Sequence, residues 1–168
     1  MLQLRCTQKV RDQFSITDDV LSQPKESTAA MGNWHVNLFI LDRRKTLIFM
    51  SEPTLFSFLL VGARKDNSTN LPDLFIRGVT QILEVESLTE VQIASALGND
   101  GVLTLSKAVN RTSITYMNHL TAVYKQKVNS GDDERYHDEW DLITSTNRMP
   151  QRTLGWKTPI ELVRELVD

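Results

Sequence analysis

The sequence lacks the residues on which several classes of protein depend. Cys6 is the only cysteine among 168 residues, which excludes an internal disulfide and a cysteine-based zinc site. No stretch approaches the roughly 18 apolar residues of a membrane span, and Met1–Cys6 lacks the long apolar run of a signal peptide. We therefore expect a cytoplasmic protein with a reduced thiol and no membrane contact.

An excess of charge of one sign is missing as well. Lys and Arg total 19 and Asp and Glu total 21, so the formal net charge is −2. A chain this close to neutral is not adapted as a whole to nucleic acid or to acidic membranes, although a local patch can still serve. The length and the 40% hydrophobic content predict one globular domain over residues 1–168, with a loop at 15–33, where periodicity is weak.

Motifs for cofactor chemistry are also absent. The densest glycine pair, in Gly98–Gly101, lacks the lysine and the following Ser or Thr of a phosphate-binding loop, and a helix end followed by a turn explains it. His35, His119 and His137 show no metal-ligand spacing, and no Gly-x-Ser-x-Gly elbow occurs. A carboxylate pair such as Glu134 and Asp138 fits a solvated helix face better than a metal site. We expect no cofactor and no metal.

What is present begins with four strand-like segments. Leu2–Cys6 alternates apolar and polar residues, which predicts an N-terminal strand. Three further β-rich segments are separated by two polar turns that are too short for a parallel crossover, so they predict an antiparallel meander. These segments are Trp34–Leu41, Thr46–Met50 and Leu55–Val61.

Helical patterns dominate the rest of the chain. Helices are expected over 7–14, from Leu71, from a Ser87 capping box to Gly98, over 110–128, over 133–146 and from the Thr158 capping box, with a short strand over 102–105. We expect Trp156 to dock the last helix onto the domain. We also expect five side chains from two of these helices to be mostly buried: Met117, Leu120, Tyr124, Trp140 and Ile143. The fold class is α+β, a small antiparallel sheet (three-stranded meander plus N-terminal strand) covered by four to five helices.

One charge pattern suggests a binding surface. Residues 101–130 contain no Asp or Glu but carry Lys107, Arg111, Lys125 and Lys127. Such a segment either contacts a phosphate or nucleic-acid backbone or packs against the acidic residues 132–141 that follow. The candidate ligand or nucleic-acid contacts are Asn37, Lys107, Asn110, Arg111, Asn118, Lys125 and Arg148.

Two resemblances bear on these residues. Asn147–Pro150 followed by Leu154–Glu161 resembles the tail of integrase-type insertion-sequence transposases. The resemblance implies a metal-binding carboxylate on a helix some tens of residues earlier, but residues 101–130 contain none. The acid triad for two-metal chemistry is therefore missing, and we reject transposase activity.

The second resemblance covers nearly the whole chain. Leu2–Lys9, Gly32–Leu38, Arg43–Lys45, Asn110–Ser113 and the segment from Asn147 to Pro159 are similar to a bacterial family, domain of unknown function 6933. The resemblance implies a small bacterial or phage cytosolic protein and brings no activity with it.

Three functions are compatible with these observations. The leading hypothesis is a non-enzymatic binding or regulatory domain that acts through a protein or nucleic-acid partner. The first alternative is an enzyme acting on a phosphorylated or nucleotide substrate bound by Asn110, Arg111 and Asn118. The second is a phage-type inhibitor of a host defence complex, in which the acidic residues 132–141 mimic nucleic acid. A deep pocket joining Asn37, Asn110, Arg111 and a histidine favours an enzyme, and a flat surface with exposed Trp favours a binder. The oligomeric state stays open.

Overall fold

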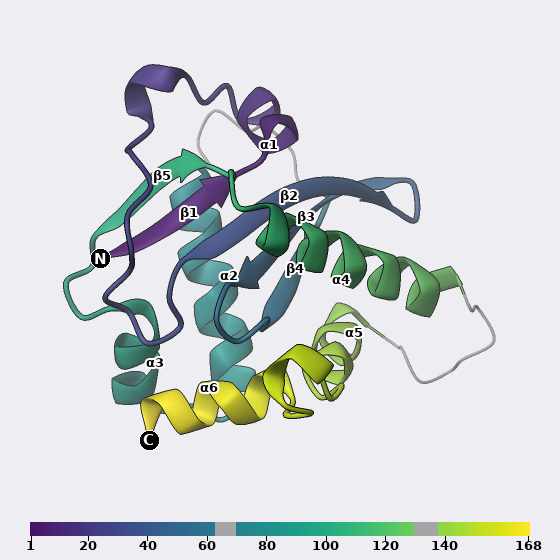
Figure 1. Cartoon of the computed structure of the whole chain (residues 1–168). Coiled ribbons are helices and arrows are strands. Elements are labelled where there is room, and N and C mark those ends of the chain that lie inside the picture. Colours follow the sequence, from purple (N-terminus) through teal and green to yellow (C-terminus); the bar gives the residue numbers. More distant parts are fainter. Residues whose placement is uncertain (63–69, 130–137) are drawn as a thin grey trace.

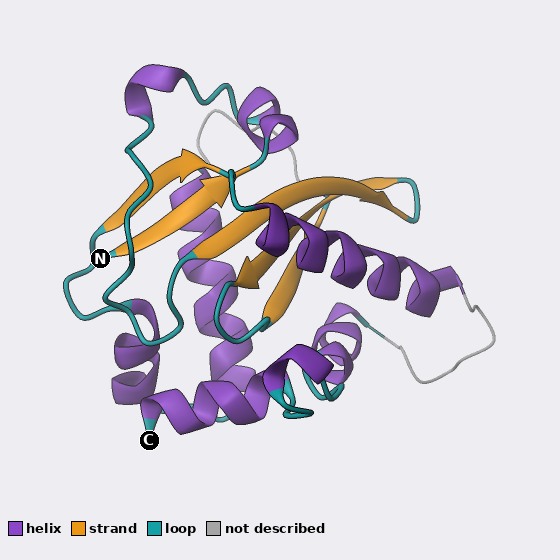
Figure 2. Cartoon of the chain, in the orientation of Figure 1, coloured by secondary structure: helices purple, strands orange, loops and turns teal. Residues whose placement is uncertain are grey.

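A five-stranded mixed sheet forms the centre of the molecule. The computed structural model describes residues 1–62, 70–129 and 138–168, and the strand order is β4-β3-β2-β1-β5 (Figure 1, Figure 2). The strands are β1 (Leu2–Cys6), β2 (Trp34–Leu41), β3 (Arg44–Ser51), β4 (Ser57–Val61) and β5 (Leu103–Lys107).

The predicted meander is confirmed. β2 pairs antiparallel with β3, and β3 pairs antiparallel with β4. The first turn is tighter than the sequence suggested, because Leu41 pairs with Arg44 and only Asp42 and Arg43 remain between them. Both turn residues have positive φ, 46° and 63°, the backbone that lets a two-residue hairpin follow the natural strand twist.

The prediction of an antiparallel sheet is wrong for the other half. β1 pairs in parallel with β2 on one side and with β5 on the other, so the sheet is mixed and has five strands. Parallel neighbours need a long connection, and residues 7–33 provide it between β1 and β2. Which distant strand completes such a pairing is not encoded in the local alternation, so the sequence pattern could not show it.

Helices cover both faces of the sheet. α2 lies behind the strands and α4 in front of them in Figure 1. Phe75 of α2 packs with the aromatic rings of Trp34, Phe49 and Phe58, and α4 buries the predicted Met117, Leu120 and Tyr124. The helices in the described residues are α1 (Gln8–Gln13), α2 (Leu71–Val85), α3 (Glu90–Leu97), α4 (Arg111–Asn129), α5 (Glu139–Thr146) and α6 (Pro159–Val167). None of these helices is long and apolar enough to cross a membrane.

Helix ends follow the predicted signals with one correction. The capping box of Thr158 and Glu161 opens α6 as expected, and Gly98 ends α3 with a positive φ of 93°. The box that opens α3 is formed by Thr89 and Gln92, not by Ser87. Ser87 still belongs to the turn that closes α2, because its N–H donates to the Glu84 carbonyl.

Two tryptophans are more exposed than predicted. Trp140 keeps 40% of its surface accessible and Trp156 keeps 68%. α5 begins at Glu139, so Trp140 lies in its first turn, and the expected helical residues 133–137, with Tyr136, lie outside the described residues. Trp156 follows Gly155 in a tight turn with φ of 67°, and α6 docks through Ile160 and Val163 instead.

The C-terminal motif has a structural role. Asn147 is fully buried; its Oδ1 accepts from the Ser57 N–H at 2.9 Å and its Nδ2 donates to the Ser57 carbonyl at 2.7 Å. It thereby occupies hydrogen-bonding groups of the edge strand β4, which would otherwise invite pairing with another chain. Arg148 binds the buried Glu86 carboxylate with two hydrogen bonds of 2.8 and 2.7 Å.

We expect Gly78→Ala to destabilise the fold. A Cβ on Gly78 would lie 2.6 Å from Cε2 of Phe58, so this buried ring, which stacks on Phe49 at 4.7 Å, would have to shift. Overpacking costs about 1–3 kcal/mol, more than the about 1 kcal/mol by which Ala is favoured over Gly in a helix. Urea unfolding measures the difference.

Arg77→Ala, on the exposed side of the same helix, is the matched control and should change stability by less than about 0.5 kcal/mol. Phe58→Leu should cost less in the Gly78→Ala background than in the native chain, since it removes the ring edge. A Gly78→Ala protein more stable than the native chain would contradict this packing.

Candidate functional site

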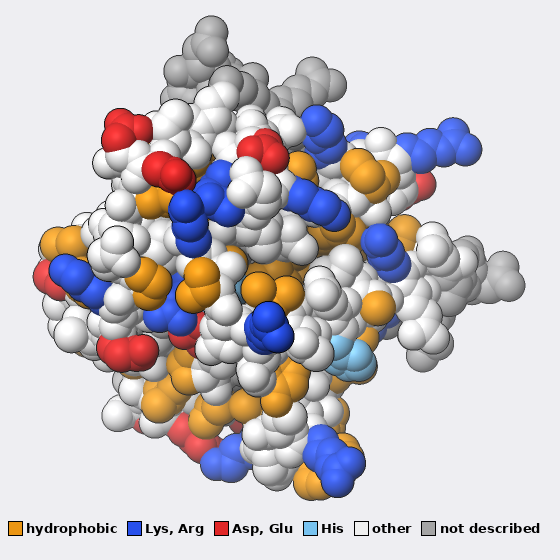
Figure 3. All heavy atoms as spheres, turned by 45° about the horizontal axis from the view of Figure 1, so that its top comes forward, with side chains coloured by type: hydrophobic (Ala, Val, Ile, Leu, Met, Phe, Trp, Pro, Cys, Tyr) orange, Lys and Arg blue, Asp and Glu red, His pale blue; other side chains and the backbone are white. Residues whose placement is uncertain are grey.

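The exposed side of α4 carries most of the side chains predicted to bind a ligand. Helical spacing places exposed residues in one stripe free of Asp and Glu, made of Arg111, Thr115, Asn118, Ala122, Lys125 and Asn129. The opposite side is the buried stripe that packs on the sheet. Figure 3 shows Lys and Arg spread over the side of the molecule seen from the top of Figure 1, with Asp and Glu among them.

Asn110 and Lys107 lead into this stripe from β5. Asn110 precedes α4 and caps it, its Oδ1 accepting from the N–H groups of Thr112 and Ser113 at 3.0 and 3.2 Å. Lys107 ends β5 and pairs with Asp18 at 3.1 Å. We call Lys107, Asn110, Arg111, Asn118 and Lys125 the α4 surface.

Three further candidates, Lys125, Asn37 and Arg148, contact other side chains of the protein. The Lys125 ammonium lies 5.7 Å from the ring centroid of Phe39. Asn37 accepts a hydrogen bond from the Thr7 hydroxyl at 2.8 Å and another from the Leu38 N–H. The Thr7 side chain therefore binds Asn37 and forms no hydrogen bond that caps α1. Arg148 is held by Glu86, apart from the α4 surface.

Beneath the first turn of α4, the sheet presents polar side chains. Strand alternation directs Leu2, Leu4 and Cys6 to the face covered by α2 and Gln3 and Arg5 to the opposite face. The parallel register sets Arg5 between His35 of β2 and Ser106 of β5. All three are more than nine-tenths buried. On the other face, burial raises the pKa of the Cys6 thiol to about 12, which leaves it a packed, unreactive group.

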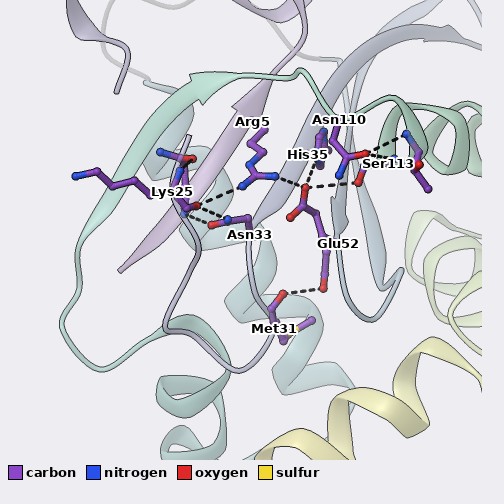
Figure 4. A network of polar contacts seen from close by, with 11 residues as sticks. Arg5, Lys25, Met31, Asn33, His35, Glu52, Asn110 and Ser113 are labelled. Carbon is purple, nitrogen blue, oxygen red and sulfur yellow. Dashed lines mark hydrogen bonds and ion pairs between the residues drawn. The ribbon is translucent and has the colours of Figure 1, made fainter. Parts of the chain in front are cut away.

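The carboxylate of Glu52 joins this row to α4. Its Oε1 atom lies 2.6 Å from Arg5 Nη1 and 2.6 Å from His35 Nε2, and the Ser113 hydroxyl donates to it at 3.5 Å (Figure 4). Glu52 directly follows β3, and its N–H donates to the Asn33 carbonyl. One oxygen therefore connects β1, β2, the end of β3 and α4.

The environment of Glu52 keeps it ionised. Burial by itself would raise the pKa of the carboxyl, but the hydrogen bond and charge of His35 together with the Arg5 guanidinium lower it below the ordinary value of 4.5. At neutral pH the group is an anion. All its donors are on Oε1, and no described residue donates to Oε2 (Figure 4).

The loop over residues 15–33 covers the rest of the polar row. Apart from a short 3₁₀ turn over Asp18–Val20, it contains no helix or strand. The Lys25 carbonyl accepts from Arg5 Nη2 at 3.3 Å and from Asn33 Nδ2 at 2.7 Å. Within the part of the chain that the structure describes, Arg5 Nε, His35 Nδ1 and Ser106 Oγ are buried and have no hydrogen-bond partner. Unpaired buried polar atoms cost stability, and such departures from optimal packing mark candidate functional sites.

The network residues were missed by sequence reasoning. Arg5 and His35 alternate with apolar residues in their strands, a signal that places them on one face but assigns them no role. Glu52 looks like an ordinary turn residue. In the described residues, no group of three His, Cys, Asp or Glu side chains is arranged to hold a metal ion. Glu134 lies outside those residues, and Asp138 caps α5 by accepting from the Asp141 N–H.

Replacing Glu52 by Gln should make stability less sensitive to acid. A carboxylate whose pKa is lowered by folding stabilises the native state above its unfolded pKa, and this contribution is lost as the pH falls through the folded pKa. Near neutral pH the variant should lose about 3 kcal/mol, since Arg5 and His35 are left without their anion. Below the ordinary pKa of 4.5 the difference between the two proteins should shrink. Urea unfolding across this pH range measures it.

Glu165→Gln is the matched control, because Glu165 forms an exposed pair with Lys157 that contributes at most about 1 kcal/mol. Equal pH dependence of the native protein and Glu52→Gln would show that the network does not stabilise the fold.

Comparisons with known proteins agree with this architecture. Among solved structures, the fold is similar to the catalytic core domain of BIV integrase, with a TM-score of 0.51 and 13% sequence identity over 79% of this chain and 93% of that chain. At this identity the likeness concerns the fold alone. No curated protein matches the sequence. The model of a family described as "Domain of unknown function (DUF6933)" matches residues 3–162. As the sequence similarity predicted, the chain belongs to the DUF6933 family.

Proposed function

We propose that this protein is a non-enzymatic binding domain whose α4 surface contacts a nucleic-acid backbone. The observation that carries the proposal is the exposed, acid-free stripe of α4, in which Arg111, Asn118 and Lys125 lie on the same side. Guanidinium, ammonium and amide groups all donate hydrogen bonds, and phosphate oxygens accept them.

The dimensions support an extended contact. The helix rises about 1.5 Å per residue, so Arg111 and Lys125 are separated by about 21 Å along it. Lys107, at the end of β5, adds a third cation beside the start of the helix, although it is paired with the exposed Asp18. A surface with three spaced cations in a chain of net charge −2 favours modest, salt-sensitive binding that depends little on sequence.

The alternative hypothesis is that the basic residues of α4 pair with the acidic residues 132–141 of the same chain. Asp138 caps α5, and Glu139 lies 3.7 Å from Arg44, so these two acidic side chains are used by α5 and by β3. Asp141 is exposed in the first turn of α5, and the other three acidic residues, Asp132, Asp133 and Glu134, lie outside the described residues. Pairing with them stays a prediction, and the experiment below tests it through stability.

We expect a labelled single-stranded oligonucleotide of about 16 nucleotides to bind at low salt. If three phosphates are neutralised, the logarithm of the association constant should fall with the logarithm of salt concentration with a slope of about −2. The double variant Arg111→Glu, Lys125→Glu should reduce the slope to about −1 and weaken binding about equally for unrelated sequences. Fluorescence anisotropy between about 50 and about 200 mM salt measures both.

Arg77→Glu is the matched charge reversal, since Arg77 is exposed on α2, which covers the opposite face of the sheet (Figure 1); it should leave binding unchanged. Absence of binding at low salt, together with a lowered melting temperature of the double variant, would overturn the proposal in favour of internal pairing. A protein partner would then be the next candidate, with the exposed Trp156 and Trp140 as the side chains to anchor it.

A further inference from the structure

Glu52 presents an acceptor next to a surface made of donors. Every hydrogen bond to its carboxylate uses Oε1. Oε2 has no donor in the described residues and is not among their buried unpartnered atoms, and the side chain keeps 18% of its surface accessible. In Figure 4 this second oxygen carries no dashed line. It is therefore open to solvent.

The position of this oxygen is fixed from below. Arg5 and His35, both buried, bind the neighbouring oxygen at 2.6 Å each, so the carboxylate cannot rotate away without losing both partners. The Ser113 contact places it beside the first turn of α4, the turn that begins with Arg111. A ligand that follows the α4 surface reaches Glu52 at the amino end of the helix.

The chemistry of a nucleic acid limits what can bind there. Phosphate oxygens are acceptors and are repelled by a carboxylate, whereas the N–H donors of a nucleic acid are on its bases. A carboxylate accepts well from the exocyclic amino group of cytosine. Because the Glu52 side chain keeps only 18% of its surface accessible, a base must leave its stack to reach it, which a single strand allows.

We propose that Glu52 Oε2 accepts a hydrogen bond from the amino group of an unstacked base, with cytosine favoured over thymine, in a single strand whose backbone lies along α4. This inference rests on the proposed function. Thymine has no amino group, and its single ring N–H lies between two carbonyl oxygens that a carboxylate repels. The α4 surface then provides affinity, and Glu52 provides base preference.

The test compares three oligonucleotides of equal length on the intact protein: oligo-dC, oligo-dT, and oligo-dC in which each cytosine N4 carries two methyl groups. The last retains the ring and the backbone but has no amino hydrogen. By anisotropy, we expect oligo-dC to bind roughly tenfold more tightly than the other two. Because the decisive change is in the ligand, the result does not depend on the folding of a variant.

Glu52→Gln extends the test to the protein. Its dC-to-dT affinity ratio should fall toward one, whereas Arg77→Glu should keep the native ratio; circular dichroism establishes that each variant is folded. Equal binding of all three oligonucleotides by the native protein would overturn the base contact and leave the backbone contact standing. Absence of binding to any of them would overturn the proposed function as well.

Discussion

A single carboxylate oxygen holds four segments of the chain in place. Oε1 of Glu52 contacts Arg5 of β1, His35 of β2 and Ser113 of α4, while Glu52 itself directly follows β3. Burying a charge is costly unless it is paired, and the native fold meets this requirement by bringing Arg5 and His35 to Glu52. The parallel pairing of β1 with β2 places Arg5 beside His35, and α4 adds the Ser113 hydroxyl. A hairpin of β2 and β3 alone would lack Arg5 and Ser113.

The two faces of the sheet differ in composition: one carries the aromatic core and the other carries the polar side chains of the candidate site. The face covered by α2 is apolar and aromatic, with Trp34, Phe58 and Phe75 in edge and tilted contacts, and such packing provides most of the folding free energy. The face covered by α4 and by the loop over residues 15–33 carries the polar row and its unpaired atoms. A domain of this size can tolerate those atoms because its apolar face is close-packed.

α4 serves both purposes because a helix has two sides. Its buried stripe packs on the sheet through Met117, Leu120 and Tyr124, and the Tyr124 hydroxyl bonds Ser57 at 2.9 Å. Its exposed stripe begins with Arg111, in the same first turn as Ser113, whose hydroxyl contacts Glu52, so the proposed backbone and base contacts meet at one helix end. The opposite edge of the sheet is closed separately, since Asn147 occupies the backbone of β4 and Arg148 ties that segment to α2 through Glu86.

Local signals in the sequence determined much of this protein. The polar turn at Asp42, the Thr158 capping box and the apolar stripe of α4 depend on neighbours within a few residues, and the strands and helices they predicted are present. The candidates on α4 were identified in the same way, because helical spacing and the absence of acid are visible in the chain. Only the tertiary structure decided the parallel pairing of β1 with β5, the convergence on Glu52 and the exposure of Trp156. Each of these depends on segments tens of residues apart, whose meeting is governed by the total free energy of packing and not by any local pattern.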